Sequence, residues 1–312
     1  MASTETQPAW RELYPYQGRH LDVAGHRLHV VDEGPADPAR HAAAEVVVML
    51  HGNPTWSFYY RDLIAELAPD YRCIAPDWIG CGLSDKPAAD AYPYTLASRI
   101  DELEAVLAVL VPTGPVTLVV HDWGGMIGMG WAHRHPERVV RFVILNTGAF
   151  PLPADKPFPW PLALTRTPLG ALLVKNFNAF SGMAARVAFK KPVDPRARAG
   201  MVAPYDTPAN RIATLRFVQD IPLRPGDPGY DIVAATGAAL GEHAGKPALI
   251  CWGALDFVFD DAFLRQWQRA WPHAEVHRFA DCGHYVLEDA GAAIRPKVRA
   301  FLQAHPLAAP AR

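Results

Sequence analysis

Asp122 stands where a predicted buried strand meets a glycine-rich helix. Residues 116–120 are β-branched and apolar, which is typical of a strand covered on both faces. Trp123 and two glycines follow the aspartate, which predicts a sharp turn into a helix, the context of a nucleophile elbow. Because such elbows usually carry serine, the sequence predicts an unusual carboxylate nucleophile.

A carboxylate nucleophile restricts the chemistry of the site. Its attack on an ordinary ester would give a reactive anhydride, whereas its attack on a polarised sp³ carbon displaces halide or alkoxide and leaves an alkyl ester on the enzyme. Water activated by a histidine can release such an ester by attacking the carbonyl carbon of the aspartate. The chain should therefore also supply a histidine, an acid that orients it and donors for an oxyanion.

His284 and Asp256 each follow a predicted strand directly. The carboxyl ends of parallel strands build the sites of open α/β sheets, and the chain order nucleophile, acid, histidine is that of α/β-hydrolases. Asp260 and Asp261 follow closely as alternative acids or as helix caps. Asp256 is favoured because the acid should come immediately after the strand.

Asn53 and Trp123 are the candidate anion donors. The backbone N–H of Asn53, in the loop after a predicted strand, and that of Trp123, next after the nucleophile, are expected to form the oxyanion hole. The side-chain amide of Asn53 and the indole N–H of Trp123 are uncharged donors. They could hold a leaving anion and still leave the charge of Asp122 intact. An arginine in their place would neutralise that charge. His51 and His121 adjoin these loops and are expected to support them from behind.

Strands alternate with helices along most of the chain, which predicts an α/β fold with a mostly parallel sheet and right-handed crossovers. Strands are expected over 20–23, 27–33, 45–50, 71–75, 116–120, 139–145, 246–253 and 275–279. Helices are expected over 56–67, 95–110, 126–135, 261–271 and 292–304, and residues 35–44 are expected to be a polar connector.

The proline-dense stretch that begins near residue 150 lacks clear strands. We therefore predict a helical cap over residues 150–229, inserted into an α/β-hydrolase core of residues 1–149 and 230–312. The prolines and leucines of residues 151–174 are equally compatible with ordinary cap packing, an apolar tunnel or a docking surface for a partner.

The composition narrows the classes of protein. The 312 residues are half hydrophobic and carry a net charge of −2, which gives no indication of a nucleic-acid or anionic-membrane partner. Four scattered cysteines and the lack of a signal pattern or of an apolar run near ~20 residues predict a cytoplasmic protein with no integral membrane segment. His133 and His135 lie on different helical faces, so no metal is expected, and no cofactor is indicated.

Five motifs resemble the haloalkane dehalogenase group of α/β-hydrolases: HGNPTWS, PDWIGCGLSD, VVHDWGGMIGM, WGALDFVF and CGHY. The resemblance runs over nearly the whole chain. It implies that Asp122 is the nucleophile, His284 the base and Asp256 the acid. It also implies that Asn53 and Trp123 stabilise a halide.

Two further positions bear on this resemblance. In the other arrangement of the group the acid follows the strand at 139–145, where Asn146-Thr147-Gly148 offers no carboxylate. Val120 stands where glycine is usual in such elbows, a departure that dehalogenase-like proteins tolerate.

Within the group, the segments FPWPLALTRTPLGALLVKNFNAFS and VAPYDTPANRIATLRFVQDIPL look like the cap of the β-lactone decarboxylases of bacterial long-chain olefin biosynthesis. This resemblance implies that the same five residues open a strained lactone to a cis-olefin and CO₂. It also implies an apolar small-molecule substrate and association with other olefin-biosynthesis enzymes in an assembly. Attack at the carbonyl or at the alkyl carbon of the lactone stays open.

Three alternatives remain at this stage. A true haloalkane dehalogenase fits the Asn53 and Trp123 pair, while fluoroacetate dehalogenases carry arginine at the Trp123 position. Epoxide hydrolases need cap tyrosines, for which Tyr205 or Tyr230 could serve. A non-catalytic subunit of an assembly would need no matched nucleophile, acid and histidine.

Overall fold

An eight-stranded sheet forms the centre of the computed structural model, which describes residues 7–307. The strand order is β1-β2-β4-β3-β5-β6-β7-β8; β1, β2 and β4 pair antiparallel, and all other neighbours pair parallel. The strands are β1 (Arg19–Val23), β2 (His26–Glu33), β3 (Val46–Leu50), β4 (Arg72–Pro76), β5 (Val116–Asp122), β6 (Val139–Thr147), β7 (Ala248–Gly253) and β8 (Glu275–Phe279). The predicted α/β-hydrolase architecture with a mostly parallel sheet is confirmed.

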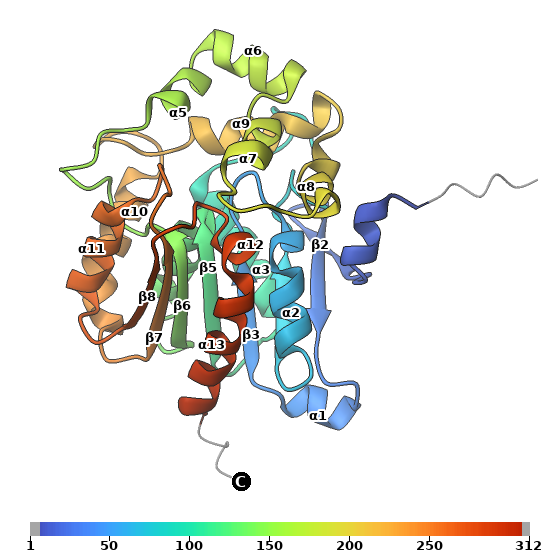
Figure 1. The fold of residues 1–312 in the computed structure, drawn as a ribbon, viewed down its shortest axis with the longest axis vertical. Helices are drawn as coiled ribbons and strands as arrows, with labels where there is room; N and C mark the ends of the chain where they lie inside the picture. Colours follow the sequence, from blue (N-terminus) through green and yellow to red (C-terminus); the bar gives the residue numbers. More distant parts are fainter. Residues whose placement is uncertain (1–6, 308–312) are drawn as a thin grey trace, which may run out of the picture.

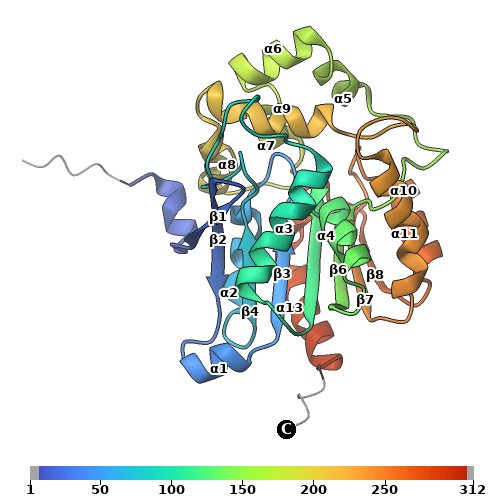
Figure 2. The ribbon, with the colours of Figure 1, turned by 180° about the vertical axis from the view of Figure 1, so that it is seen from behind.

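Helices cover both faces of this sheet (Figure 1). One face carries α2 (Arg61–Leu67), α12 (Val286–Asp289) and α13 (Gly291–Ala304), and the other, turned toward the viewer in Figure 2, carries α3 (Leu96–Leu110), α4 (Trp123–Arg134), α10 (Tyr230–Ala238) and α11 (Asp261–Ala270). Short 3₁₀ helices are η1 (Ala9–Leu13), η2 (Ser57–Tyr60), η3 (Ala203–Tyr205), η4 (Ala209–Arg211) and η5 (Ala239–His243). No helix within residues 7–307 is long and apolar enough to cross a bilayer.

A run of helices between β6 and β7 lies beyond the carboxyl ends of the strands, at the top of Figure 1. It comprises α5 (Trp160–Thr165), α6 (Pro168–Phe177), α7 (Ser181–Val187), α8 (Pro195–Val202) and α9 (Ile212–Gln219). Proline at the first turn of α5, α6 and α8 suits helix starts, where its missing N–H costs no hydrogen bond. This arrangement puts the helices directly over the edge of the sheet that carries Asp122.

Two sequence expectations differ from the structure. The connector expected over 35–44 contains α1 (Pro38–Ala43), because Asp37 accepts a hydrogen bond from the Arg40 N–H and Pro38 occupies the first turn. The helix given as residues 126–135 begins three residues earlier, at Trp123, directly after Asp122. The two glycines after Trp123 open this helix, as the sequence predicted.

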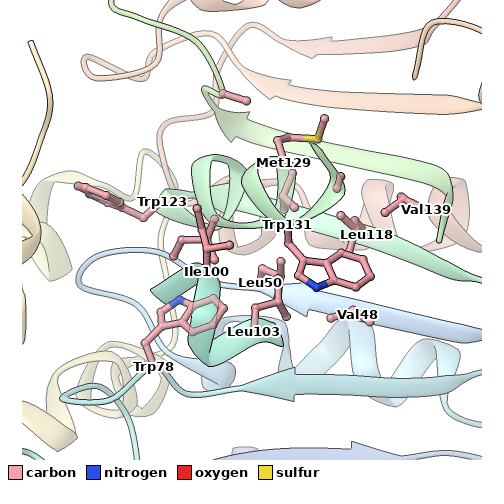
Figure 3. Close-up of a cluster of buried hydrophobic side chains, with 14 of the residues drawn as sticks. Val48, Leu50, Trp78, Ile100, Leu103, Leu118, Trp123, Met129, Trp131 and Val139 are labelled. Atoms are coloured by element: carbon pink, nitrogen blue, oxygen red, sulfur yellow. The ribbon is translucent and has the colours of Figure 1, made fainter. Parts of the chain in front are cut away.

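The central strand β5 is buried along its whole length because both faces are covered. Leu118 and Val120 point into the cluster formed with α3 and α4, and Val119 points into the cluster on the opposite face. Figure 3 shows the first cluster, in which Trp131 packs near Leu118. Each such apolar side chain contributes about 1.5–3 kcal/mol through its burial, so β5 is rigidly held beneath the elbow.

Gly124 lets the first turn of α4 approach the end of β3 closely. A Cβ on Gly124 would lie 1.9 Å from the carbonyl oxygen of Leu50, which is backbone and has little freedom to move. A Cβ on Gly130, farther along α4, would meet the terminal methyl of Ile100 at 2.5 Å, which a rotamer change can relieve. Of these two glycines, only Gly124 is therefore required by the packing of the backbone.

We expect Gly124→Ala to lower the free energy of unfolding by about 3 kcal/mol or more, because the new methyl must displace β3 or α4. Gly130→Ala is the matched control and should change it by no more than about 1 kcal/mol, since the helix propensity of alanine offsets mild crowding. Urea denaturation of both variants measures the difference. Equal destabilisation would contradict the backbone constraint.

Candidate active site

Asp122 occupies a strained backbone conformation at the end of β5, with φ 53° and ψ −127°. A positive φ is costly for a residue with a Cβ and is found where the surrounding structure enforces it. The Thr147 hydroxyl donates to the Asp122 carbonyl, and a Cβ on Gly52 would lie 2.0 Å from Asp122 Oδ1. The turn therefore presents the carboxylate above the sheet, as a nucleophile elbow does.

The two oxygens of Asp122 have different surroundings. The backbone N–H of Asn53 donates to Oδ1 at 2.6 Å, which is a short, charge-assisted hydrogen bond. Oδ2 lies 3.5 Å from His284 Nε2, and the Asp122 residue borders the cavity described below. One oxygen is thus held by the backbone, and the other lies beside the histidine.

His284 connects Asp122 to Asp256. Its Nδ1 lies 2.7 Å from Asp256 Oδ2, and all three side chains are buried. Asp256 also accepts hydrogen bonds from the Val258 N–H and from Asn146 Nδ2. The structure therefore brings together the three residues that the sequence indicates as nucleophile, histidine and acid.

The alternative acids lie elsewhere. Asp260 caps α11 by accepting from the Ala262 N–H and pairs with Lys156, and Asp261 pairs with Arg278. Asp260 therefore has the cap role that the sequence allowed, Asp261 forms an ion pair instead, and Asp256 is the carboxylate beside His284.

Burial disfavours the charged forms of Asp122 and His284, and the pairing of opposite charges outweighs this cost. Burial alone would raise the pKa of Asp122, but the hydrogen bond and positive charge of His284, with the Asn53 N–H, outweigh it and lower that pKa. Burial alone would lower the pKa of His284, but Asp256 and Asp122 outweigh it and raise that pKa to about 10. At neutral pH the site thus holds an imidazolium between two carboxylates.

His121 supports His284 from behind. Its Nε2 hydrogen-bonds to the His284 carbonyl at 2.9 Å, and its ring stacks on Tyr59 with 4.4 Å between ring centroids. Burial, with repulsion from His284, lowers the pKa of His121 to about 3, so it stays neutral and Nε2 carries the donated proton. His121 holds the backbone of His284 without adding a second positive charge.

Asn146 is a site residue that sequence reasoning missed. Its amide donates to Asp256 Oδ2 and to the Gly253 carbonyl, and its oxygen accepts from the Gly253 N–H. In the sequence, Asn146 was noted only because it is not a carboxylate. Its position at the end of β6, the strand that pairs with β7, could have indicated that its amide orients Asp256.

The side chains of Asn53 and Trp123 lie next to Asp122 at the base of the cavity. Asn53 Nδ2 donates one hydrogen to the Thr214 carbonyl at 3.0 Å, which leaves its second hydrogen for another acceptor. The ring of Trp123 packs on Phe217, with 5.0 Å between centroids. Among the described residues, its indole N–H forms no hydrogen bond. Helix α9 supplies both Thr214 and Phe217, and so fixes these two donors.

An apolar cavity of about 370 Å³ lies above the carboxylate. Asp122, His284, Asn53 and Trp123 form its base, and its walls come mainly from the helices and loops of the segment between β6 and β7. The wall residues include Phe158, Leu162, Leu173, Val174, Phe180, Ala184, Val218 and Ile221. Such a lining suits a small molecule with alkyl groups. Neither Tyr205 nor Tyr230 borders this cavity, so neither is placed to act on a ligand as an epoxide hydrolase would require.

Within residues 7–307, no three His, Cys, Asp or Glu side chains are gathered so that they could hold a metal ion. His135 pairs with Glu104 at 2.6 Å. The cysteines are free and buried.

We expect the charged state of His284 to make stability depend on pH. Its folded-state pKa of about 10 lies above its ordinary value of 6.5, so the stabilisation is complete below about pH 6.5 and is lost as the pH rises through about 10. The free energy of unfolding should therefore fall more steeply over this range in the wild type than in His284→Gln, which shares every other titrating group. Urea unfolding at a series of pH values measures the slopes, and parallel slopes would exclude the charged pair.

Known proteins resemble this chain over most of its length. Residues 45–291 match the α/β hydrolase fold family. A "cis-3-alkyl-4-alkyloxetan-2-one decarboxylase" of Shewanella oneidensis is 53% identical over 292 residues, which cover 93% of this chain and 89% of the relative. A protein of the same name from Xanthomonas campestris is 49% identical and covers 94% of this chain and 98% of its own length.

Solved structures of haloalkane dehalogenases have a fold similar to that of this chain. A loop variant of a haloalkane dehalogenase from Bradyrhizobium elkanii matches with a TM-score of 0.80 and 26% identity, covering 92% of this chain and 96% of that structure. The chain belongs to the α/β hydrolase fold family, in the group that contains the cis-3-alkyl-4-alkyloxetan-2-one decarboxylases and the haloalkane dehalogenases.

Proposed function

We propose that the protein decarboxylates cis-3,4-dialkyl β-lactones to cis-olefins and CO₂, with Asp122 as nucleophile. The observation that carries the proposal is the carboxylate at the base of an apolar cavity, held on Oδ1 by the Asn53 N–H, with His284 Nε2 3.5 Å from Oδ2. The names of the two decarboxylase relatives supply the substrate class. His284, Asp256, Asn53 and Trp123 complete the machinery.

In the first step Oδ2 of Asp122 attacks the ring carbon that carries the lactone oxygen. The bond between that carbon and the ring oxygen breaks, relieving ring strain, and the released group is a carboxylate on the neighbouring carbon. The second hydrogen of the Asn53 amide and the indole N–H of Trp123 stabilise this anion. Because the Asn53 backbone N–H already binds Oδ1, which becomes the ester carbonyl oxygen, this geometry favours alkyl attack over attack on the lactone carbonyl.

In the second step the carboxylate leaves as CO₂. The electron pair of the breaking carbon–carbon bond forms the double bond, and the Asp122 carboxylate departs with the electrons of its ester bond. No water, oxidant or reductant is consumed, and Asp122 is regenerated. Inversion in the first step and anti departure in the second together convert a cis lactone into a cis olefin.

His284 assists this sequence through its charge. Its raised pKa keeps the free enzyme's imidazole protonated at neutral pH, beside the Asp122 carboxylate that must form again when the olefin leaves. Asp256 and Asn146 hold the ring in place. A hydrolytic enzyme needs a neutral imidazole at the ester stage, whereas decarboxylation makes no demand for a base.

The same proposal includes the organisation of the chain. Residues 150–229 act as a cap over the core formed by residues 1–149 and 230–312, since most of the cavity wall comes from this stretch. We place the enzyme in the cytoplasm because its four cysteines are scattered and it shows no signal pattern. The resemblance to the β-lactone decarboxylases supports its association with other enzymes of long-chain olefin biosynthesis.

A haloalkane dehalogenase is the second candidate. The pair of uncharged donors, Asn53 and Trp123, beside a carboxylate would suit halide as a leaving group, and the similarity to the Bradyrhizobium elkanii enzyme supports this reading. The alkyl ester would then require hydrolysis by water with His284 as base.

A cis-dialkyl β-lactone and a 1-bromoalkane, assayed side by side, should separate these functions. We expect cis-olefin and CO₂ from the lactone, detected by gas chromatography, and little bromide release. Asp122→Asn should lower olefin formation by about 10⁴-fold or more, because the amide is a poor nucleophile. Bromide release at useful turnover, with no olefin from the lactone, would replace the proposal with the dehalogenase.

A single turnover in H₂¹⁸O tests the fate of the ester. With enzyme in excess over lactone, we expect no ¹⁸O in the peptide that contains Asp122, because the olefin leaves without hydrolysis. Any bromoalkane that is turned over should place ¹⁸O in that peptide, because water attacks the aspartyl carbonyl. Mass spectrometry of the digested protein measures the ¹⁸O content of this peptide. Incorporation of ¹⁸O from water during turnover of the lactone would contradict the decarboxylative step.

A further inference from the structure

Helices α5, α6 and α7 carry an exposed apolar surface, which we call the outer face. Its members are Trp160, Leu164, Leu169, Leu172, Phe177, Met183 and Val187. Trp160 is 76% exposed and Phe177 is 71% exposed. Figures 1 and 2 both place α5 and α6 at the end of the molecule farthest from α1. Large contiguous apolar surfaces are uncommon on proteins that stay free in water, and they mark interaction sites.

The outer face surrounds one side of the cavity. Trp160, Leu164, Met183 and Val187 are exposed to solvent and also line the cavity. Helix α6 separates the two environments: its inner residues border the cavity, and Leu169 and Leu172 point outward. A helix that is apolar on both sides is normally covered on both sides, so the outer side of α6 lacks a covering layer.

The charge of this region differs from that of the whole chain. Residues 156–198 contain eight lysines and arginines and one acidic residue, Asp194, although the whole chain has a net charge of −2. Several of these cations are neutralised: Lys156 pairs with Asp260, and Lys191 pairs with Asp281.

Three basic side chains of this region are exposed and have no carboxylate partner among the described residues: Lys175 on α6, Arg186 on α7, and Lys190, which follows α7 and donates to the Val187 carbonyl. Lys175 lies three residues after Leu172, on the same side of α6. Arg186 lies three residues after Met183 on α7, where it shares the exposed side with Val187. The outer face therefore combines insertable apolar groups with free positive charge.

We infer that the outer face binds the surface of an anionic phospholipid bilayer, with the mouth of the cavity turned toward the lipid. Tryptophan, phenylalanine and leucine side chains would enter the interfacial layer, and the lysine and arginine head groups would meet the lipid phosphates. A second copy of this chain is disfavoured as the occupant, because a two-fold contact would bring the same unpaired cations together. This inference goes beyond the proposed reaction and does not depend on it.

Flotation of the full-length protein with vesicles tests the inference. We expect it to float with phosphatidylglycerol vesicles, to stay behind with phosphatidylcholine vesicles, and to be released as salt screens the charges. Lys175→Gln and Arg186→Gln should each lower the partition coefficient about fivefold, and Leu172→Ser about tenfold.

Matched controls exist far from the outer face. Arg40 on α1 is an exposed cation that lies 3.6 Å from the exposed Asp70 carboxylate, and Val109 near the end of α3 is an exposed apolar residue. Arg40→Gln and Val109→Ser should leave vesicle binding unchanged. Circular dichroism of all variants checks that these surface changes leave the fold intact.

Several outcomes would overturn the inference. They are absence of binding to phosphatidylglycerol, equal binding to both lipids, and equal losses in the control variants. Concentration-dependent dimerisation abolished by Leu172→Ser, without vesicle binding, would assign the face to a second copy instead. Asp122→Asn should bind vesicles as the wild type does, so failure of the proposed reaction and failure of lipid binding are measured separately.

Discussion

The close contact between the first turn of α4 and the end of β3 determines where the groups of the site lie. Gly124 brings the start of α4 against the Leu50 carbonyl, and Gly52 leaves room for the Asp122 carboxylate above the loop. Because these backbones touch, the Asn53 N–H reaches Asp122 at hydrogen-bond distance. The strained φ of Asp122 is maintained by this packing, in keeping with strain that a rigid surrounding imposes on a functional residue.

The electrostatics of the site depend on this geometry. Two buried carboxylates and one buried histidine would each be costly alone, and they become stable together because His284 lies between the two aspartates. The lowered pKa of Asp122 means that its side chain is an anion at neutral pH. His284 supplies the positive charge beside this anion, while His121 and the Asn53 and Trp123 donors are uncharged.

The helices between β6 and β7 give the site its environment. Their inner residues make an apolar cavity over Asp122, while their outer residues combine exposed apolar groups with unpaired lysine and arginine. The carboxylate of Asp122 and most of the apolar lining above it thus come from different parts of the chain. The near-neutral charge of the whole protein conceals this local excess of positive charge, since acidic residues elsewhere balance it.

The sequence by itself determined the parts that depend on local pattern. The apolar run before Asp122, the glycines after it and the strands before Asp256 and His284 predicted the elbow, the acid and the histidine, and the alternation of strands and helices predicted the sheet. Only the tertiary structure decided which residues contact these groups. Asn146 donates to Asp256, and His121 donates to the His284 carbonyl. The Thr214 carbonyl binds the Asn53 amide, and Phe217 packs on Trp123. These contacts join residues far apart in the chain, and no local period or spacing encodes them. The sequence left open whether residues 151–174 pack within the cap, line a tunnel or form a docking surface, because an apolar helix has the same sequence whether its second side is covered or exposed.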